Sequence, residues 1–172
     1  MLFAMFLAFS TTTAMADDVL ADSLINSGNA YLDMRDYDRA IMAYSAALAI
    51  NPDHYLSLLN RGVAYYSKGD LDQAIEDWSA ALRIRPDDFD ALNNLGAAYA
   101  NKGYIDRAIA NYTAALRIRP NDYATLNNRG LAYAWKGDLD RAIADWEAVL
   151  RINPNHADAR QNLEIARQQR GR

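Results

Sequence analysis

Asparagine recurs every 34 residues along most of the chain. An amide side chain carries both a hydrogen-bond donor and an acceptor, which is what pairing with an extended peptide backbone requires. The recurring residues are Asn26, Asn60, Asn94, Asn128 and Asn162, and further asparagines close to this column are Asn29, Asn93, Asn101 and Asn127. The pattern predicts an amide-lined surface that binds a peptide. The competing interpretation is that each amide bonds a neighbouring helix and stiffens the fold, since buried amides are usually satisfied within the protein.

Catalytic and metal chemistry find little support in the other polar residues. His54 and His156 each stand alone in a predicted surface turn, with no glutamate or histidine at a helical ligand spacing. The aspartates from Asp33 to Asp38 lack the glycine and the distal glutamate of a calcium loop, so helix capping explains them better. The chain has no cysteine, which excludes disulfides, thiolate ligands and cysteine nucleophiles. We therefore expect no enzyme activity, no metal, no other cofactor and no small-molecule substrate.

The spacing of the asparagines belongs to a repeat that spans most of the chain. All four prolines share the same 34-residue spacing; they are Pro52, Pro86, Pro120 and Pro154. With proline at position 32, the units are residues 21–54, 55–88, 89–122 and 123–156. Each unit has glycine at position 8, tyrosine at 11, alanine at 20 and an aromatic residue at 24.

Each unit is predicted to form two helices. Positions 4, 8 and 11 follow the stripe of one helix face, as in Leu58, Gly62 and Tyr65. A glycine and aspartate turn starts the second helix, and the proline ends it because the residue before proline is disfavoured in the α region. The residues expected to cap the following helix are Asp53, Asp87, Asn121 and Asn155.

Glycine at position 8 lies within a predicted helix, where it costs about 1 kcal/mol relative to alanine. Its recurrence in Gly28, Gly62, Gly96 and Gly130 therefore needs a compensating contact. We expect glycine at 8 and alanine at 20 to let the two helices approach closely. The aromatic residues at 11 and 24 are then core residues.

These residues resemble the tetratricopeptide repeat (TPR) family, which shares the glycine, tyrosine, alanine, aromatic and proline positions. The resemblance covers residues 21–156. It implies an all-α fold, a right-handed superhelical solenoid of four helix-turn-helix units, whose concave face binds partner proteins without catalysis. Residues 157–170 are expected to form a C-terminal capping helix, because the last unit of a solenoid would otherwise expose an apolar face.

The second and fourth units share an arginine at position 7 that the other two lack. Arg61 occurs with Asp77 and Trp78, and Arg129 occurs with Asp145 and Trp146. The joint occurrence suggests an ion pair across the helix hairpin, with stacking of the guanidinium on the tryptophan. The alternative is duplication of a two-unit block without a direct contact.

Positions 2, 6, 9 and 13 lie opposite the packing stripe of the first helix, and the asparagine column is position 6. Tyr66 and Trp135 can add apolar contacts to this face, Trp135 as an exposed anchor. Its charged residues are acidic, Asp22 and Asp90, so a neutral to basic extended partner segment is favoured over an acidic one. The alternative function is a self-associating, homo-oligomeric scaffold in the cell envelope.

The formal net charge of −4 disfavours nucleic-acid binding. Residues 1–16 are predicted to be a secretory signal peptide, because an apolar run precedes Ala14, Met15 and Ala16, which fit a cleavage site. The run is too short to span a bilayer, so we expect an exported protein, periplasmic or secreted. No lysine or arginine precedes the run. Alternatives are therefore a start site assigned too far downstream, a cytoplasmic protein or an N-terminal membrane tether.

Overall fold

The computed structural model describes residues 2–171, and it describes no side chains for residues 2–16 and 18. The predicted signal peptide, 1–16, thus falls outside the described side chains and stays a prediction. Among the described residues, none of the helices is both long and apolar enough to cross a membrane.

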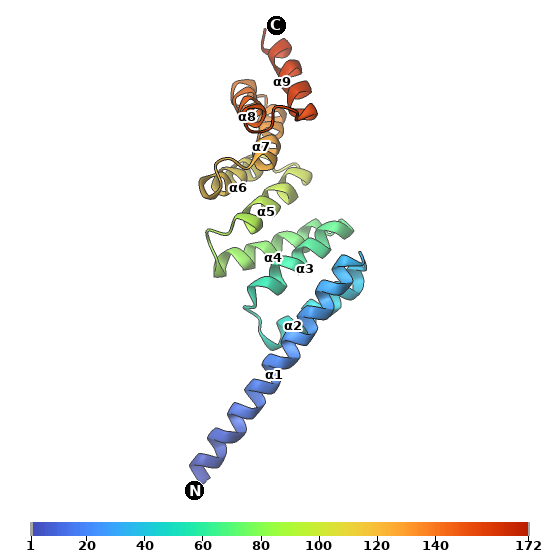
Figure 1. Cartoon of the computed structure of the whole chain (residues 1–172), viewed down its shortest axis with the longest axis vertical. Coiled ribbons are helices and arrows are strands. Elements are labelled where there is room, and N and C mark those ends of the chain that lie inside the picture. Colours follow the sequence, from blue (N-terminus) through green and yellow to red (C-terminus); the bar gives the residue numbers. More distant parts are fainter. Residues whose placement is uncertain (1, 172) are drawn as a thin grey trace. The chain divides into compact units, whose positions relative to one another are not determined.

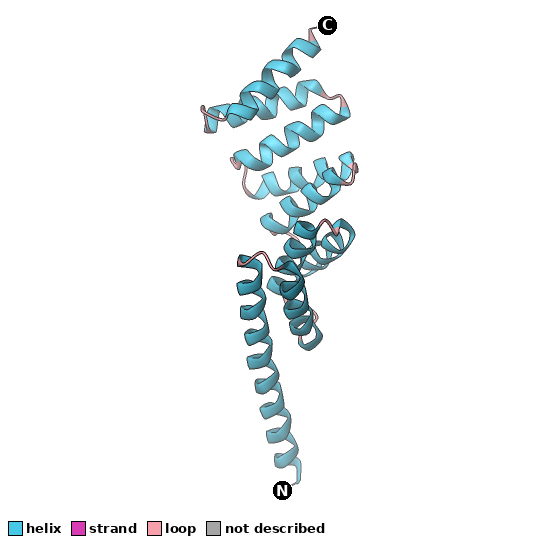
Figure 2. Ribbon diagram, turned by 90° about the vertical axis from the view of Figure 1, so that its right-hand side faces the viewer, coloured by secondary structure: helices cyan, strands magenta, loops and turns pink. Residues whose placement is uncertain are grey.

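The described residues are helical throughout, with short turns and no strand between 2 and 171, as the all-α prediction required (Figure 2). The helices are α1 (Leu2–Asp33), α2 (Tyr37–Ile50), α3 (Tyr55–Lys68), α4 (Leu71–Ile84), α5 (Phe89–Asn101), α6 (Ile105–Ile118), α7 (Tyr123–Lys136), α8 (Leu139–Ile152) and α9 (Ala157–Arg170).

The helices pack as hairpins within two compact units that divide between Ile84 and Arg85 (Figure 1). In the N-terminal unit, α1 packs on α2, α2 on α3 and α3 on α4. In the C-terminal unit, α5 packs on α6, α6 on α7, α7 on α8 and α8 on α9. Helices α1, α3, α5, α7 and α9, which we call the first helices, carry the asparagine column.

The caps of α3, α5, α7 and α9 differ from the sequence prediction. The cap prediction for Asp53, Asp87, Asn121 and Asn155 is wrong, because the capping residue follows each of them by one position. The capping residues are His54, Asp88, Asp122 and His156, whose side chains accept the N–H of the third helical residue. A side chain reaches that N–H only from the position directly before the helix. His54 and His156 are therefore half-buried caps that accept through Nδ1, not plain surface turn residues.

The turn inside each hairpin requires a left-handed residue at position 15. Gly69, Gly103 and Gly137 have φ of 90°, 78° and 84°. The first hairpin has Arg35 at this position, with φ of 58°. A residue with a Cβ is disfavoured in this region, so the first turn stores strain that the glycine turns avoid.

The compensating contact for each helical glycine is the aromatic ring at position 24. A Cβ built on Gly28 would lie 2.6 Å from the ring of buried Tyr44, and one built on Gly62 would lie 2.5 Å from Nε1 of buried Trp78. The rings thus lie directly over the glycines. The prediction that the aromatic residues are core residues is confirmed at position 24. At position 11, Tyr133 is buried, whereas Tyr31, Tyr65 and Tyr99 are half-buried.

Candidate functional site

A bidentate ion pair fastens the second hairpin of each unit. Arg61 donates through Nε and Nη2 to Asp77 at 2.8 and 2.7 Å, and its Nη1 donates to Ser45 Oγ at 2.9 Å. The guanidinium therefore joins α3 to α4 and to α2. The hydrogen bonds to Asp77 raise the pKa of Arg61 above its ordinary value.

The C-terminal unit repeats this contact. Arg129 donates to both oxygens of Asp145 at 2.8 and 2.7 Å, and to Thr113 Oγ1 at 3.2 Å. The predicted ion pair is confirmed in both units. The predicted stacking partner is different: the guanidinium carbons lie 5.8 Å from the ring centre of Tyr65 and 5.7 Å from that of Tyr133.

In the N-terminal unit the amides bond within the protein. Asn29 Oδ1 accepts the hydroxyl of Tyr44 at 2.7 Å and the Nδ2 of Asn60 at 3.0 Å. Burial raises the pKa of Tyr44 to about 12, so its hydroxyl stays a donor at neutral pH. Asn60 and Asn29 thus follow the competing interpretation, in which amides stiffen the stack. Asn26 is exposed.

In the C-terminal unit, the asparagines at position 5, next to the position-6 column, also lie against the protein. The hydroxyl oxygen of Thr125 lies 2.9 Å from Asn93 Oδ1, which joins α5 to α7, and 2.7 Å from Asp122 Oδ1, so the two acceptors share its single proton. The equivalent oxygen of Asn127 is buried, and no side chain or backbone group in the described part of the chain bonds it. Ala159 occupies the place of Thr125 one repeat later and has no hydroxyl to donate.

The position-6 amides of the C-terminal unit behave differently from Asn60. Asn94, Asn128 and Asn162 are half-buried, and within the described residues their side chains make no hydrogen bond. They lie on α5, α7 and α9, the three first helices of this unit. This row of amides is available to an external donor or acceptor.

Apolar side chains lie on the same face of the C-terminal unit. Trp135 on α7 is 60% exposed and Ile165 on α9 is 44% exposed, whereas Tyr66 in the other unit is half-buried, with its ring centre 5.7 Å from that of Trp78. Asn101, near the end of α5, is exposed. Sequence reasoning overlooked Ile165, although its place at position 9, after Ala97 and Leu131, was a usable signal.

The acidic residues of this face are exposed at position 2. Asp22 and Asp158 are exposed, and Asp90 lies 3.8 Å from Arg119, with both side chains more than half exposed. An ion pair this exposed is weak, so Arg119 neutralises little of the negative potential around Asp90. Within the described ranges, no cluster of three histidine, cysteine, aspartate or glutamate side chains could hold a metal ion.

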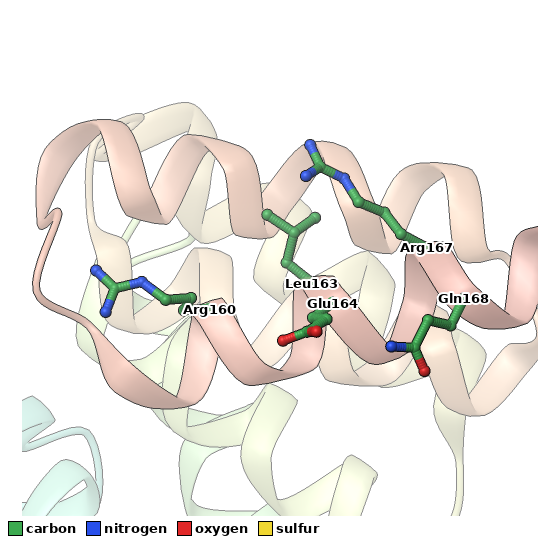
Figure 3. Close-up of a pocket in the computed structure, with 5 residues that line it drawn as sticks. All are labelled: Arg160, Leu163, Glu164, Arg167 and Gln168. Atoms are coloured by element: carbon green, nitrogen blue, oxygen red, sulfur yellow. The ribbon is translucent and has the colours of Figure 1, made fainter.

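A hollow of about 540 Å³ lies on the outer side of α9 (Figure 3). Arg160, Leu163, Glu164, Arg167 and Gln168 line it. Arg167 pairs with Glu147 on α8 at 2.8 Å, and Arg160 donates to the carbonyl of Pro154. Arg160 and Arg167 occupy repeat positions 4 and 11, which in the other repeats pack on the second helix of the hairpin. The outer surface of α9 is therefore polar where the other first helices are apolar.

Comparison with known proteins identifies the repeats. Family profiles described as TPR repeat match residues 28–69 and 62–103, and profiles described as Tetratricopeptide repeat match 89–122 and 123–156. No curated protein matches the sequence.

Solved structures share the fold. The MamA protein is 25% identical with a TM-score of 0.85, over 88% of this chain and 83% of that one. YrrB, a TPR protein with an unusual peptide-binding site, is 24% identical with a TM-score of 0.82, over 94% and 83%. The first TPR of Spaghetti, bound to an HSP90 peptide, is 24% identical with a TM-score of 0.67, over 69% and 94%. The chain belongs to the tetratricopeptide repeat family, whose proteins are generally non-catalytic interaction modules.

Proposed function

We propose that this protein is a non-catalytic adaptor that binds an extended segment of a partner protein on the first helices of its C-terminal unit. The observation that carries the proposal is the row formed by Asn94, Asn128 and Asn162, whose amides have no partner among the described residues. A half-buried amide without a protein partner bonds water in the free protein, and a guest backbone can replace that water with a net gain of about 1 kcal/mol for each hydrogen bond.

The spacing of the helices suits an extended guest. Packed helices lie about 10 Å apart, and an extended chain rises roughly 3.3 Å per residue. Successive asparagines therefore meet about every third peptide residue. Because backbone groups are the same in every sequence, this row supplies affinity without strong selectivity, and the exposed Trp135 adds an apolar anchor.

The charge of the face favours a neutral to basic segment. From residue 21 onward, positions 2, 6, 9 and 13 of the first helices carry no lysine or arginine. Several of these positions are aspartates. Acidic segments would meet Asp90 and Asp158 without a compensating cation on those positions.

We also propose that the chain is exported. The support is the apolar run and the small residues at Ala14 and Ala16. N-terminal sequencing of the protein purified from its natural source tests this proposal. A mature chain that begins at Asp17 is the expected result, and a chain that retains residues 1–16 contradicts it.

The binding proposal is tested by selecting peptides from a random display library on the immobilised protein. A variant in which Asn94, Asn128 and Asn162 are all replaced with alanine should lose capture of the selected peptides at unchanged helical content. The matched control replaces three exposed amides outside this face, Gln73, Asn121 and Asn155, with alanine and should retain capture. Equal capture by both variants would contradict the proposal.

A further inference from the structure

A second row of side chains runs beside the amide row of the C-terminal unit. Ala97, Leu131 and Ile165 occupy position 9 of α5, α7 and α9, three residues after each asparagine and therefore on the same helix face. Ala97 and Leu131 are half-buried, and Ile165 is 44% exposed. This apolar row combines with the amide row into one two-sided track.

Contacts near their N-terminal ends join the three helices that carry the track. The hydrogen bond of Thr125 to Asn93 joins α7 to α5, and the rings of Tyr123 and His156 join the starts of α7 and α9 at 5.8 Å between centres. Leu126 and Leu163 belong to the same buried cluster, so α7 and α9 also share a core through α8. The amide row and the apolar row therefore both pass from α5 to α7 and on to α9.

The direction of every third side chain selects a backbone conformation for the guest, because three residues of an extended chain or of a polyproline II chain both span about 9–10 Å. A polyproline II chain repeats its side-chain direction every three residues and rises about 3.1 Å per residue, so every third side chain recurs after roughly 9 Å. That repeat matches the spacing of about 10 Å between packed helices. A β-strand, which alternates every residue, would turn successive helix contacts to opposite sides.

The aspartates beside the track determine which residues of the guest are favoured between its apolar residues. Asp158 is exposed beside the track, and Asp90 is held only by a pair with Arg119 at 3.8 Å. Positions 2, 6, 9 and 13 of the three helices carry no basic residue. Residues of the guest that face this edge are therefore favoured when they are basic.

We propose that the track takes a polyproline II segment with an apolar side chain at every third residue and basic residues between. The inference rests on the proposed binding function and adds the register and the charge of the guest. The apolar residues contact the row of Ala97, Leu131 and Ile165, and the carbonyl and N–H groups of the guest pair with the amides.

The N-terminal unit lacks such a track. Its position-9 residues are Asn29 and Val63, so polar and apolar side chains share the row. Asn29 also bonds Asn60, which removes an amide from the neighbouring row. The two units thus serve as test and control within one chain.

The test uses fluorescence anisotropy with three labelled nine-residue peptides and the full chain. The first repeats leucine, proline and lysine in that order. The second has the same composition with its three leucines adjacent, and the third replaces lysine with glutamate. We expect the first peptide to bind at least about tenfold more tightly than the other two. Similar affinities for all three would overturn the proposed register and charge.

Two variants of similar side-chain exposure locate the binding. Ile165→Ser should weaken the first peptide by about tenfold, because the leucine loses an apolar contact. Leu56→Ser in the N-terminal unit, where Leu56 is 49% exposed, should leave the affinity within about twofold. Equal losses would overturn the assignment to the C-terminal unit.

The two proposals fail in different ways. If library-selected peptides depend on Asn94, Asn128 and Asn162 but show no three-residue pattern, the register inference is wrong and the binding proposal stands. If no selected peptide depends on these asparagines, the binding proposal fails as well.

Discussion

The two units share an ion pair and differ in their amides. Arg61 in one unit and Arg129 in the other make the same bidentate contact, to Asp77 and Asp145. Asn60 is bonded to Asn29, whereas its counterpart Asn128 makes no hydrogen bond within the described residues. The difference arises at position 9, where Asn29 is replaced by Ala97 in the repeat before Asn128. An invariant residue therefore performs different tasks according to its neighbour in the adjacent repeat.

The tryptophans also differ between the two units. Trp78 Nε1 donates to the carbonyl of Leu59 at 3.1 Å, while Trp146 Nε1 is buried without an acceptor in the described part of the chain. Asn127 Oδ1 in the same unit also lacks a partner there. The C-terminal unit thus combines the open amides with two buried polar atoms that have no partner among the described residues.

Removal of one partner from the shared ion pair should have the largest effect. Arg129→Leu leaves the Asp145 carboxylate, with 8% of its side chain exposed, without its cation. We expect a loss of about 3 kcal/mol in the free energy of unfolding, measured by urea denaturation.

Two controls sharpen this prediction. The third repeat carries an uncharged pair, Leu95 and Asn111, at the two positions of the ion pair. A double variant that combines Arg129→Leu with Asp145→Asn should therefore recover most of the loss, and Arg61→Leu should cost as much as Arg129→Leu. A double variant as unstable as the single one would show that the buried charge is not the cause.

A methyl group added at the helical glycines should distinguish the two tryptophan sites. A Cβ at position 62 would lie 2.5 Å from Nε1 of Trp78, and one at position 130 would lie 2.9 Å from that of Trp146. We expect Gly62→Ala to cost about 2 kcal/mol, after the gain in helix propensity, and Gly130→Ala to cost less. Thermal or urea unfolding measures the order, and a larger cost at Gly130 would contradict it.

A hydroxyl supplied to Asn127 should stabilise the C-terminal unit. Ala159→Ser places a donor where Thr125 serves Asn93 in the preceding repeat. We expect a gain of about 1 kcal/mol in urea unfolding. The gain should disappear when Asn127 is replaced with leucine, the residue type of its counterpart Leu59 in the other unit. A gain that persists in that background would rule out the proposed bond.

The smallest expected effect concerns the turn of the first hairpin. Arg35→Gly removes a side chain from a residue with φ of 58°, so stability should rise by about 0.5–1 kcal/mol. Gly137→Ala in the fourth hairpin, at φ of 84°, should lower stability by a similar amount. Differential scanning calorimetry measures both, and a destabilised Arg35→Gly variant would contradict the strain argument.

The period and the composition of the repeat were enough to predict the helices, the core aromatic residues at position 24 and the Arg61–Asp77 pair. Each depends on residues at fixed positions inside one repeat. The contact of the helical glycines differs from the prediction, because the nearest atoms belong to the ring at position 24 and not to the alanine at position 20. Two of the helix caps, His54 and His156, were misplaced because histidine is an unusual cap. The other two, Asp88 and Asp122, each follow another residue that can cap a helix, so the sequence left the position open by one residue. The division of the amides was not predictable from the asparagine column alone, because it depends on the neighbouring repeat, as the contacts of Asn29 show.

The most direct measurement compares two single substitutions at the same repeat position. The affinity of a library-selected peptide is determined by titration calorimetry for Asn128→Ala and for Asn60→Ala. We expect Asn128→Ala to weaken binding by about tenfold and Asn60→Ala to leave it within about twofold. Equal losses, or a greater loss at Asn60, would contradict the assignment of binding to the unpaired amides of the C-terminal unit.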